Sequence, residues 1–469
     1  MTRAPCSAEQ FATPVCLIVT LCGALTAPER IKGQCSFDWL PTQTYPGEAV
    51  FDPALALTTW NDELFVGGVL GGIDPKTGVA VIDEGLAKWN GAAWENVGTG
   101  LHCSSPPGDC GSPHNSTAAV TAFTTFQGEL IAGGSFDYAG DLEVNGIARW
   151  DGSRWAGFGE GLRGCYSGDL PQECDTRVYD LLDYSGQLIA AGNFYSAGGA
   201  QTGPIARWDG IQWRPLEPGL QEGWAYAIAE FHGELIVGGG RLTFVGSPAQ
   251  RTGLAKWDGS TLLPVSGGPF SQVDALALYD GQLVVSGRLG QTNGVATWDG
   301  STWTMLGTSI GGGYPVMALA VFNGELIVAG SCWNDYTSEI TADCISRWDG
   351  VGWRPFGNVT GPDGYFPNYV AALTVHKGEL IAGGSFLGIG ERASAGWARL
   401  GRIGVGGDWD DDGYVRMADG AAWPTCLSGP ASPDSHAITS DSCLCVFNVD
   451  GDGDLDLFDF ATFQNAFGD

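Results

Sequence analysis

The stretch Gly128–Gly134, which reads Gly-Glu-Leu-Ile-Ala-Gly-Gly, decides the fold because close copies of it recur along the chain. The same phrase returns at Gly233–Gly239 and at Gly378–Gly384. Weaker copies begin at Asp62, Gly186, Gly281 and Gly324, which makes seven in all. Seven copies of one phrase along the chain indicate a repeat architecture, since a single repeat cannot bury its apolar faces alone.

A second phrase, usually Ala-Arg-Trp-Asp-Gly as at Ala148–Gly152, follows each copy of the first. Its copies are centred on Trp89, Trp150, Trp208, Trp257, Trp298, Trp348 and Trp397. A second Trp often comes five residues later, at Trp94, Trp155, Trp213, Trp303 and Trp353. An apolar stretch precedes each first phrase, and x-Gly and Asp-Gly turns separate the segments. Each repeat therefore predicts four short strands, and we interpret the Trp residues as packing between repeats.

A repeat of four short strands is typical of a β-propeller. We expect an all-β fold over residues 36–403, a seven-bladed β-propeller of four-stranded antiparallel blades. The seventh repeat stops at Leu400 without a fourth strand, and Phe37–Pro41 is similar to the fourth strand at Gln212–Leu216. We therefore expect residues 36–41 to complete the last blade. The order of double Gly, aromatic-Asp and Trp resembles the kelch-type repeat of galactose-oxidase-like propellers, which implies an architecture but no particular activity.

Two acidic loops near the C-terminus have the ligand spacing of EF-hand calcium loops, with Gly at position 6 and an apolar residue at position 8. The first offers Asp408, Asp410, Asp412, Tyr414 and Asp419 as ligands. The second offers Asn448, Asp450, Asp452, Asp454, Asp456 and Asp459. The apolar residues Phe460, Phe463 and Phe467 follow at helix spacing. We expect two bound calcium ions.

This pair of loops resembles a dockerin type I module, which docks extracellular enzymes onto cohesin modules. Asp419 and Asp459 stand at position 12, as in dockerin loops. The resemblance implies a small α-helical calcium-binding module over residues 408–469, after a Gly-rich linker at 404–407, and a cohesin-like protein as a partner. Loop positions 10 and 11, polar in many cohesin-reading dockerins, are apolar here, so calcium-dependent folding carries over better than cohesin binding.

The N-terminus and the cysteines indicate an exported protein. Residues 1–34 read as a signal peptide, with cleavage at about 27–35, and a retained N-terminal anchor is the alternative. No other segment is long enough to span a bilayer. Close cysteine pairs predict three local disulfides, Cys103–Cys110, Cys165–Cys174 and Cys332–Cys344. In the tail we expect Cys426 to pair with Cys443 or Cys445.

The long loops, those between strands 2 and 3 and those between repeats, fall on one face and have the form of a binding surface. Their aromatic residues are Tyr138, Tyr166, Tyr195, Trp224, Phe244, Tyr314, Trp333, Tyr336, Tyr365 and Tyr369. Because aromatic rings stack on sugars, our candidate ligand-binding residues are Tyr138, Tyr166, Tyr195, Trp333, Tyr336 and Tyr365. The alternative is that these rings pin their own loops. A net charge of −31 argues against nucleic-acid or anionic-membrane partners.

No catalytic constellation stands out, because the chain has no zinc-protease helix, nucleophile elbow or phosphate loop. Loop carboxylates at Asp137, Asp141, Glu143, Asp335 and Glu339 leave paired-acid glycoside cleavage open. The sequence favours a secreted or cell-surface calcium-binding protein that binds a polysaccharide or cell-surface ligand without catalysis. The alternatives are a polysaccharide-degrading lyase or glycosidase recruited through its dockerin-like tail, and a structural surface protein.

Overall fold

The computed structural model describes residues 37–402, with gaps at 41–52, 70, 74–79, 83–84, 91–93, 104–117, 165–175, 291, 308–314, 333–343, 362–367, 391 and 395. Residues 37–401 form one compact domain. The regular structure in the described residues is entirely β-strand, arranged in antiparallel sheets, and it includes no helix that could cross a bilayer. The predicted signal peptide, linker and calcium module lie outside the described residues.

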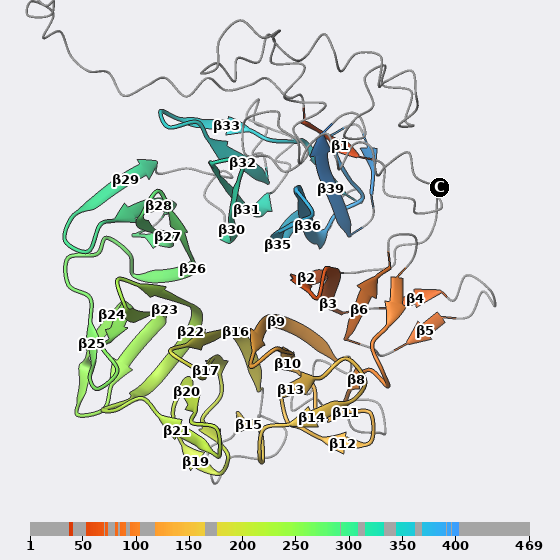
Figure 1. Cartoon of the computed structure of the whole chain (residues 1–469). Helices are drawn as coiled ribbons and strands as arrows, with labels where there is room; N and C mark the ends of the chain where they lie inside the picture. The colour runs from red at the N-terminus through yellow and green to blue at the C-terminus, as the bar shows by residue number, and fades with distance from the viewer. Residues whose placement is uncertain are drawn as a thin grey trace, which may run out of the picture. The chain divides into compact units, whose positions relative to one another are not determined.

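Seven repeats of four strands make up this domain, numbered here in chain order (Figure 1). Repeats 1 to 3 comprise β2 (Ala54–Trp60), β3 (Glu63–Gly68), β6 (Leu86–Trp89) and β7 (Trp94–Asn96); β9 (Ala119–Phe126), β10 (Glu129–Ser135), β13 (Ile147–Trp150) and β14 (Trp155–Gly157); and β16 (Arg177–Tyr184), β17 (Gln187–Asn193), β20 (Ile205–Trp208) and β21 (Trp213–Pro215).

Repeats 4 to 6 comprise β22 (Leu220–Phe231), β23 (Glu234–Phe244), β24 (Ser247–Trp257) and β25 (Leu262–Pro264); β26 (Gln272–Tyr279), β27 (Gln282–Leu289), β28 (Thr292–Trp298) and β29 (Trp303–Gly307); and β30 (Val316–Phe322), β31 (Glu325–Cys332), β32 (Ile345–Trp348) and β33 (Trp353–Pro355). Repeat 7 comprises β35 (Asn368–His376), β36 (Glu379–Ser385) and β39 (Trp397–Arg402), and β1 (Phe37–Leu40) takes its fourth place beside β39.

The two repeated phrases form strands 2 and 3 of each repeat, and in five repeats an ion pair couples them. In repeat 2, Leu130 lies opposite Trp150 and Ile131 opposite Arg149. The glutamate that opens strand 2 pairs with the cation of strand 3. These pairs are Glu63–Lys88, Glu129–Arg149, Glu234–Lys256, Glu325–Arg347 and Glu379–Arg399. The repetition of Glu in one phrase and Arg or Lys in the other thus follows from cross-strand pairing.

The Asp-Gly of the second phrase caps the turn between strands 3 and 4. The Asp151 carboxylate accepts hydrogen bonds from the backbone N–H groups of Ser153 and Arg154. The hydrogen bond from the Ser153 hydroxyl, followed by these two backbone bonds, favours the charged form and lowers the pKa of Asp151. Asp209, Asp258, Asp299 and Asp349 make the same two bonds in their own turns. The Asp is therefore a turn residue, and its recurrence needs no binding role.

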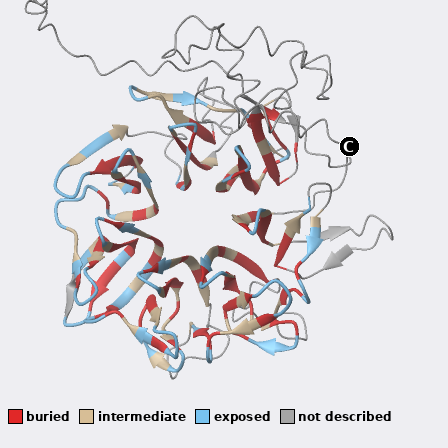
Figure 2. Ribbon diagram, in the orientation of Figure 1, coloured by how far each residue is buried: buried red, intermediate tan, exposed pale blue. Residues whose placement is uncertain are grey.

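The apolar core consists of seven clusters in the described residues, each shared by two consecutive repeats. The cluster that joins repeat 7 to repeat 1 contains Ile381 and Trp397 together with Ala54, Leu64 and Val66. The first strands contact one another in the same cycle, β2–β9–β16–β22–β26–β30–β35 and back to β2. Within this domain the repeats therefore close on themselves, with buried residues concentrated in the strands and exposed ones at the outer turns (Figure 2).

The Trp of strand 4 ties each of four repeats to the one before it. Its indole N–H donates to a backbone carbonyl at or just after the preceding repeat's fourth strand. These bonds are Trp155 to Val97 (3.1 Å), Trp213 to Phe158 (3.0 Å), Trp353 to Leu306 (2.8 Å) and Trp39 to Phe356 (3.2 Å). Trp39 in β1 makes the bond that a strand-4 Trp makes elsewhere, so the N-terminal strand occupies the seventh fourth-strand position.

We expected Trp397 to occupy the same position in strand 3 as the Trp residues of the other repeats. This was wrong, because Trp397 lies three positions earlier and Leu400 occupies that place. Leu380 lies opposite Leu400, whereas the equivalent Leu130 lies opposite Trp150. Trp397 instead lies opposite Gly383, at the position of Ile147 in repeat 2. Its ring is buried 5.2 Å from those of Trp89 and Trp94, in repeat 1. Trp397 therefore fills the contact between the last and first repeats.

Candidate functional site

The long connections meet as hydrogen-bonded accessory sheets, which place the strand 2–3 hairpins beside the segments that enter each repeat. The three-stranded sheets are β8 (Leu101–His102), β11 (Tyr138–Ala139) and β12 (Leu142–Glu143); β15 (Leu162–Arg163), β18 (Ser196–Ala197) and β19 (Ala200–Gln201); and β34 (Val359–Thr360), β37 (Gly388–Ile389) and β38 (Arg392–Ala393). A further pair in repeat 1 is β4 (Gly71–Ile73) with β5 (Ala80–Ile82). Both kinds of long loop therefore lie on the same side of the domain.

Repeat 4 extends its own strands instead of building a separate accessory sheet. At the start of β22, Leu220 and Glu222 pair with Phe244 and Thr243 at the end of β23. The Thr243 side chain accepts a hydrogen bond from the backbone N–H of Glu222 at 3.1 Å. This extended hairpin faces the strand 2–3 hairpin of repeat 3 across a cavity.

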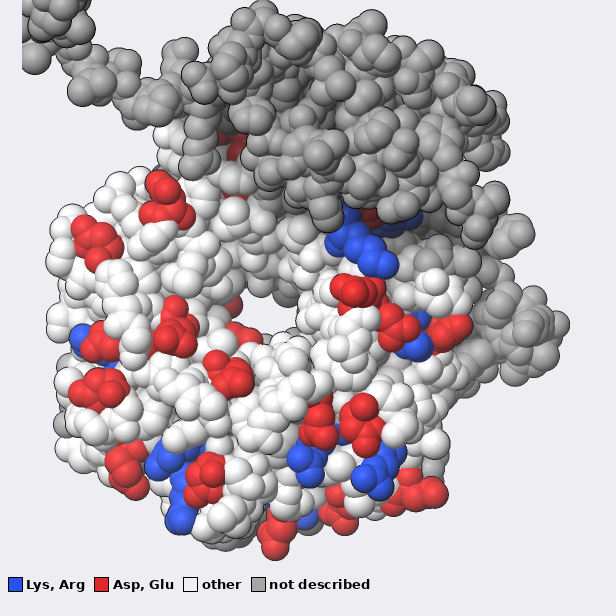
Figure 3. All heavy atoms as spheres, in the orientation of Figure 1, with Lys and Arg blue, Asp and Glu red and all other residues white. Residues whose placement is uncertain are grey.

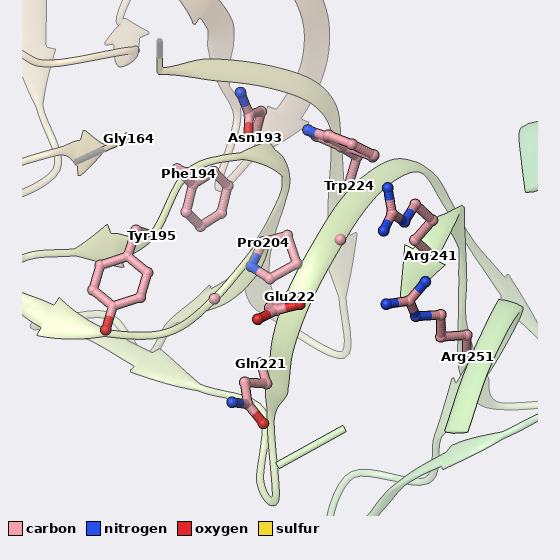
Figure 4. A pocket seen from close by; sticks show the side chains of 12 residues that line it. Gly164, Asn193, Phe194, Tyr195, Pro204, Gln221, Glu222, Trp224, Arg241 and Arg251 are labelled. Carbon is pink, nitrogen blue, oxygen red and sulfur yellow. The ribbon is translucent and has the colours of Figure 1, made fainter. Parts of the chain in front are cut away.

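The cavity has a volume of about 360 Å³, at the small end of the range for ligand sites. Repeat 3 and the connection that leads into it supply one side, and repeat 4 supplies the other (Figure 4). The lining residues are Gly164, Asn193, Phe194, Tyr195, Gly203, Pro204, Gln221, Glu222, Gly223, Trp224, Arg241 and Arg251. Of the six candidate ligand-binding residues, only Tyr195 lies here among those that the structure describes.

Two aromatic rings from different repeats line this cavity. Trp224, on β22 opposite Gly240, is 37% exposed, which is high for so large an apolar side chain. Tyr195 is half-buried, and its backbone is fixed because its N–H donates to Arg163 at 2.8 Å and its carbonyl accepts from Thr202 and Gly203. Rings held on firm backbone near solvent suit stacking on a flat, partly apolar ligand.

The charged residues of the cavity all come from repeat 4. Arg241 and Arg251 are exposed, and Arg251 lies opposite Thr243, two residues beyond Arg241 on the neighbouring strand. Arg241 has a left-handed backbone (φ 56°), which interrupts the strand at a register shift. Glu222 is exposed on the facing strand. The charged lining is thus two guanidinium groups and one carboxylate, 2 − 1 = +1.

A second group of polar side chains lies on the first strands of repeats 3 to 5. The Asp180 carboxylate accepts hydrogen bonds from the N–H of Leu181 and from the N–H of Ile228 in repeat 4, both at 2.8 Å. Desolvation raises the pKa of Asp180 to about 7 although some of its surface remains accessible. Burial also raises the pKa of Tyr226, to about 12, and that of Asp274. These groups do not line the cavity.

Other candidate residues lie elsewhere. Tyr138 stacks on His102 at a centroid distance of 5.6 Å, within the accessory sheet of repeat 2. Phe244, one of the loop aromatics, is buried at 4% exposure and packs in the core between repeats 3 and 4. Both side chains therefore stabilise their own loops, which agrees with the alternative that the aromatic rings pin loops and do not bind a ligand. Tyr166, Trp333, Tyr336 and Tyr365 lie outside the residues whose side chains are described.

The predicted metal ligands and most of the predicted disulfides also fall outside the described residues. All eleven calcium-ligand candidates, Asp408 to Asp459, belong to this group. Cys103 and Cys344 are each disulfide-bonded, and their predicted partners Cys110 and Cys332 lie outside the described side chains. In the part of the chain that is described, no three His, Cys, Asp or Glu side chains gather into a metal site.

Comparison with known proteins does not assign a family. No family model and no curated protein matches the chain. Solved structures that align with it include the extracellular domain of the one-component system BT4673 from B. thetaiotaomicron (11% identity, TM-score 0.44, 79% of this chain and 40% of that one). Another is catalytically inactive virginiamycin B lyase from Staphylococcus aureus with quinupristin (12%, TM-score 0.43, 78% and 99%). The designed protein Ika8 aligns at 17% identity (TM-score 0.39, 76% and 100%). At these values the alignments carry no argument about activity.

Proposed function

We propose that residues 37–402 form a seven-bladed, kelch-like β-propeller closed by its N-terminal strand. Two observations support this assignment: each of the seven core clusters is shared by consecutive repeats, and the first strands contact one another in a closed cycle. The indole bond from Trp39 to Phe356, which matches those of three other repeats, supports the closure by β1.

The propeller binds a saccharide without catalysis, through the cavity between repeats 3 and 4. The observation that carries this proposal is the pair of aromatic rings, the half-buried Tyr195 and the exposed Trp224, that line one cavity together with polar side chains. Sugars present apolar ring faces and hydroxyl groups, so rings that stack and polar groups that orient suit them together. A polysaccharide or a cell-surface glycan is the corresponding ligand class.

The remaining parts of the chain serve export and attachment. The signal-peptide pattern at 1–34 supports secretion, and the two loops at 408–469 support calcium binding in a dockerin-like module. A cohesin-like protein is the partner that this resemblance suggests. The protein would then present a saccharide-binding propeller from a calcium-ordered tail.

A polysaccharide panel with the mature protein in calcium tests the binding role. Trp224→Ala and Tyr195→Ala should each weaken retention about tenfold, the effect of losing a contact worth roughly 1–1.5 kcal/mol. Tyr138→Ala is the matched control, since it removes a loop aromatic outside the cavity, and it should retain the wild-type affinity.

The same panel, read for newly released sugar ends, separates the competing functions. Retention without release agrees with the proposal. Release of sugar ends by the wild type would replace it with a lyase or glycosidase activity. If the cavity variants bind as the wild type does, the cavity is not the saccharide site. If no saccharide is retained at all, the result favours a structural role.

A further inference from the structure

The cavity contains two arginines that have no acidic partner in the described part of an otherwise strongly acidic chain. Acidic residues outnumber basic ones, 53 to 22. Arg241 and Arg251 nevertheless form no ion pair and no hydrogen bond among the described residues, although Glu222 lines the same cavity. Two guanidinium groups in one cavity, neither paired within the part of the chain that the structure describes, are therefore a local exception to the charge of the whole molecule.

Most other cations on the described repeats have an acidic neighbour. The side chains of Lys88, Arg149, Arg154, Arg163, Arg214, Lys256, Arg347, Arg354 and Arg399 all lie within 4.0 Å of a carboxylate. On the face shown in Figure 3, Lys and Arg side chains accordingly lie beside Asp and Glu side chains. A second cavity, of about 260 Å³ and lined by Trp60 and Lys88, illustrates this rule, because its Lys88 ammonium is 2.7 Å from Glu63.

The sequence between the two arginines is also exceptional. Residues 241–251 read Arg-Leu-Thr-Phe-Val-Gly-Ser-Pro-Ala-Gln-Arg and contain no Asp or Glu. They form the hairpin of β23 and β24, so the two arginines come from adjacent strands (Figure 4). The hairpin therefore presents positive charge without a built-in counterion.

We propose that this cavity selects an acidic saccharide, whose carboxylate or sulfate ester is bound by Arg241 and Arg251. This inference rests on the proposed saccharide binding and specifies the class of sugar. The guanidinium group presents a planar set of N–H donors that match the oxygens of such anions. Trp224 and Tyr195 then contact the ring of the same sugar or of its neighbour. Because the rest of the protein is negatively charged, a local pair of cations favours this cavity over other surfaces for an anion.

Glu222 gives the cavity its second source of selectivity. Its carboxylate repels an anionic group that approaches too closely. An anionic ligand is therefore held toward the arginine side of the cavity. Removal of the Glu222 charge should strengthen binding of acidic sugars, whereas a residue with a merely structural role would give no gain.

Calorimetric titration of the mature chain with matched saccharide pairs tests the proposal. Each pair contains an acidic oligosaccharide and its neutral counterpart: oligouronides with their carboxyl-reduced forms, and sulfated oligosaccharides with their desulfated forms. We expect at least one acidic member to bind about tenfold or more tightly than its neutral partner. The two kinds of pair distinguish carboxylate from sulfate.

Charge variants connect that preference to the cavity. Arg241→Gln and Arg251→Gln should each weaken the acidic member about three- to tenfold, and the double variant should bind both members of the pair equally. Glu222→Gln should tighten the acidic member and leave the neutral one unchanged. Arg154→Gln removes the same charge from an exposed turn, where Arg154 pairs with Asp151, and should behave as the wild type. Unchanged thermal melting of each variant shows that the fold is intact.

Three results would overturn the inference, and they are distinguishable. Equal binding of both members of every pair leaves saccharide binding in place but removes the selectivity. A preference that survives in the double variant places the anion elsewhere, for example on calcium in the tail, and repetition in chelator identifies that case. If no member binds, the proposed function fails together with the inference.

Discussion

At the scale of single residues, the second glycine of each Gly-Gly phrase is fixed by a close approach of backbone. A Cβ atom added at Gly134 would overlap the carbonyl oxygen of Ala119 on the neighbouring strand. The equivalent glycines meet the first strand of their own repeat in the same way, at Gly68, Gly192, Gly239, Gly287, Gly330 and Gly384. The first glycine is replaced in three repeats, by Ala191, Ser286 and Ala329. The second position is thus always glycine because a side chain would clash there, whereas the first position accepts other small residues.

Beside each of these glycines the first strand carries a β-bulge, and the residue after the bulge is Ala in six repeats. Those residues are Ala56, Ala122, Ala227, Ala275, Ala318 and Ala372. Repeat 3 has Asp180 there instead, and its carboxylate bonds to the N–H of Ile228 in repeat 4. A charged group thus occupies a site that the other repeats keep small and apolar.

Asp180 should make stability depend on pH in a defined window. Its pKa is raised from 3.8 to about 7, so the folded state binds this proton more tightly than the unfolded state does. The contribution of Asp180 to stability is therefore full below pH 4 and is lost as the pH rises toward and through 7. Asp180→Asn keeps an acceptor for Ile228 and should gain on the order of 2–4 kcal/mol relative to wild type between pH 4 and pH 8.

Denaturant unfolding of the wild type and of Asp180→Asn across this pH range measures the effect. Charge repulsion within the acidic chain changes the free energy of unfolding of both proteins alike, so it cancels when one value is subtracted from the other. Asp180→Ala, which installs the residue of the other six repeats, should follow the same trend. A difference that stays constant with pH would show that Asp180 keeps an ordinary pKa in the folded protein.

The sequence predicted some of the candidate site and missed its charged half. Because aromatic residues stand out in loops, Tyr195 was one of the six candidate residues, whereas Trp224 was named only among the long-loop aromatics. Arg241 and Arg251 were missed because they are ten positions apart, and only the pairing of β23 with β24 brings them to one cavity. The available signal was a hairpin with two arginines and no acid in an acidic chain.

At the scale of elements, the main strands followed from the repeated phrases, but the accessory strands did not. β8, β11, β12 and β15 are two residues long, and so short a segment carries no periodic pattern. Their pairing depends on loops from neighbouring repeats meeting in space. The place of β1 was predictable because Trp39 repeats the local sequence of other fourth strands.

Closure by β1 should dominate the stability of repeat 7. Trp39 is 4% exposed, packs in the cluster shared by repeats 6 and 7, and donates its indole N–H to Phe356. Trp39→Ala should cost about 3–5 kcal/mol, and Trp39→Phe, which loses that bond but keeps most of the ring, about 1–2 kcal/mol.

Deletion of residues 36–41 should lower the melting temperature at least as far as Trp39→Ala does. Chemical denaturation of the mature chain measures the two substitutions, and thermal melting compares them with the deletion. Deletion without loss of stability would mean that β1 is a passive edge strand and that the repeat domain is stable without it.

At the scale of the whole molecule, calcium should order residues 408–469 and leave the repeat domain unaffected. The predicted ligands are mostly carboxylates, which repel one another when no cation is bound. Chelation of the mature protein should therefore open residues 408–469 to proteolysis while the Trp-rich near-UV spectrum of the repeats persists.

Asp450→Ala combined with Asp459→Ala should reproduce the effect of chelator at the second loop even in calcium. Asp434→Asn is the control, because Asp434 is an acidic residue outside both loops. Equal proteolysis with and without calcium would show that the tail does not depend on the ion.

The position of β1 also determines when the domain can finish folding. The strand is made early, but its neighbour β39 is made near the end of the domain, and Trp39 and Phe356 are 317 residues apart. Until then we expect the nascent chain to be an open stack of repeats in which the outer edge of β39 is unpaired, and an unpaired strand edge is prone to association. Closure is a single late event with a large loop entropy. At high concentration the β1 strand of another molecule competes for the same edge, so crowded refolding should yield strand-exchanged dimers beside the monomer.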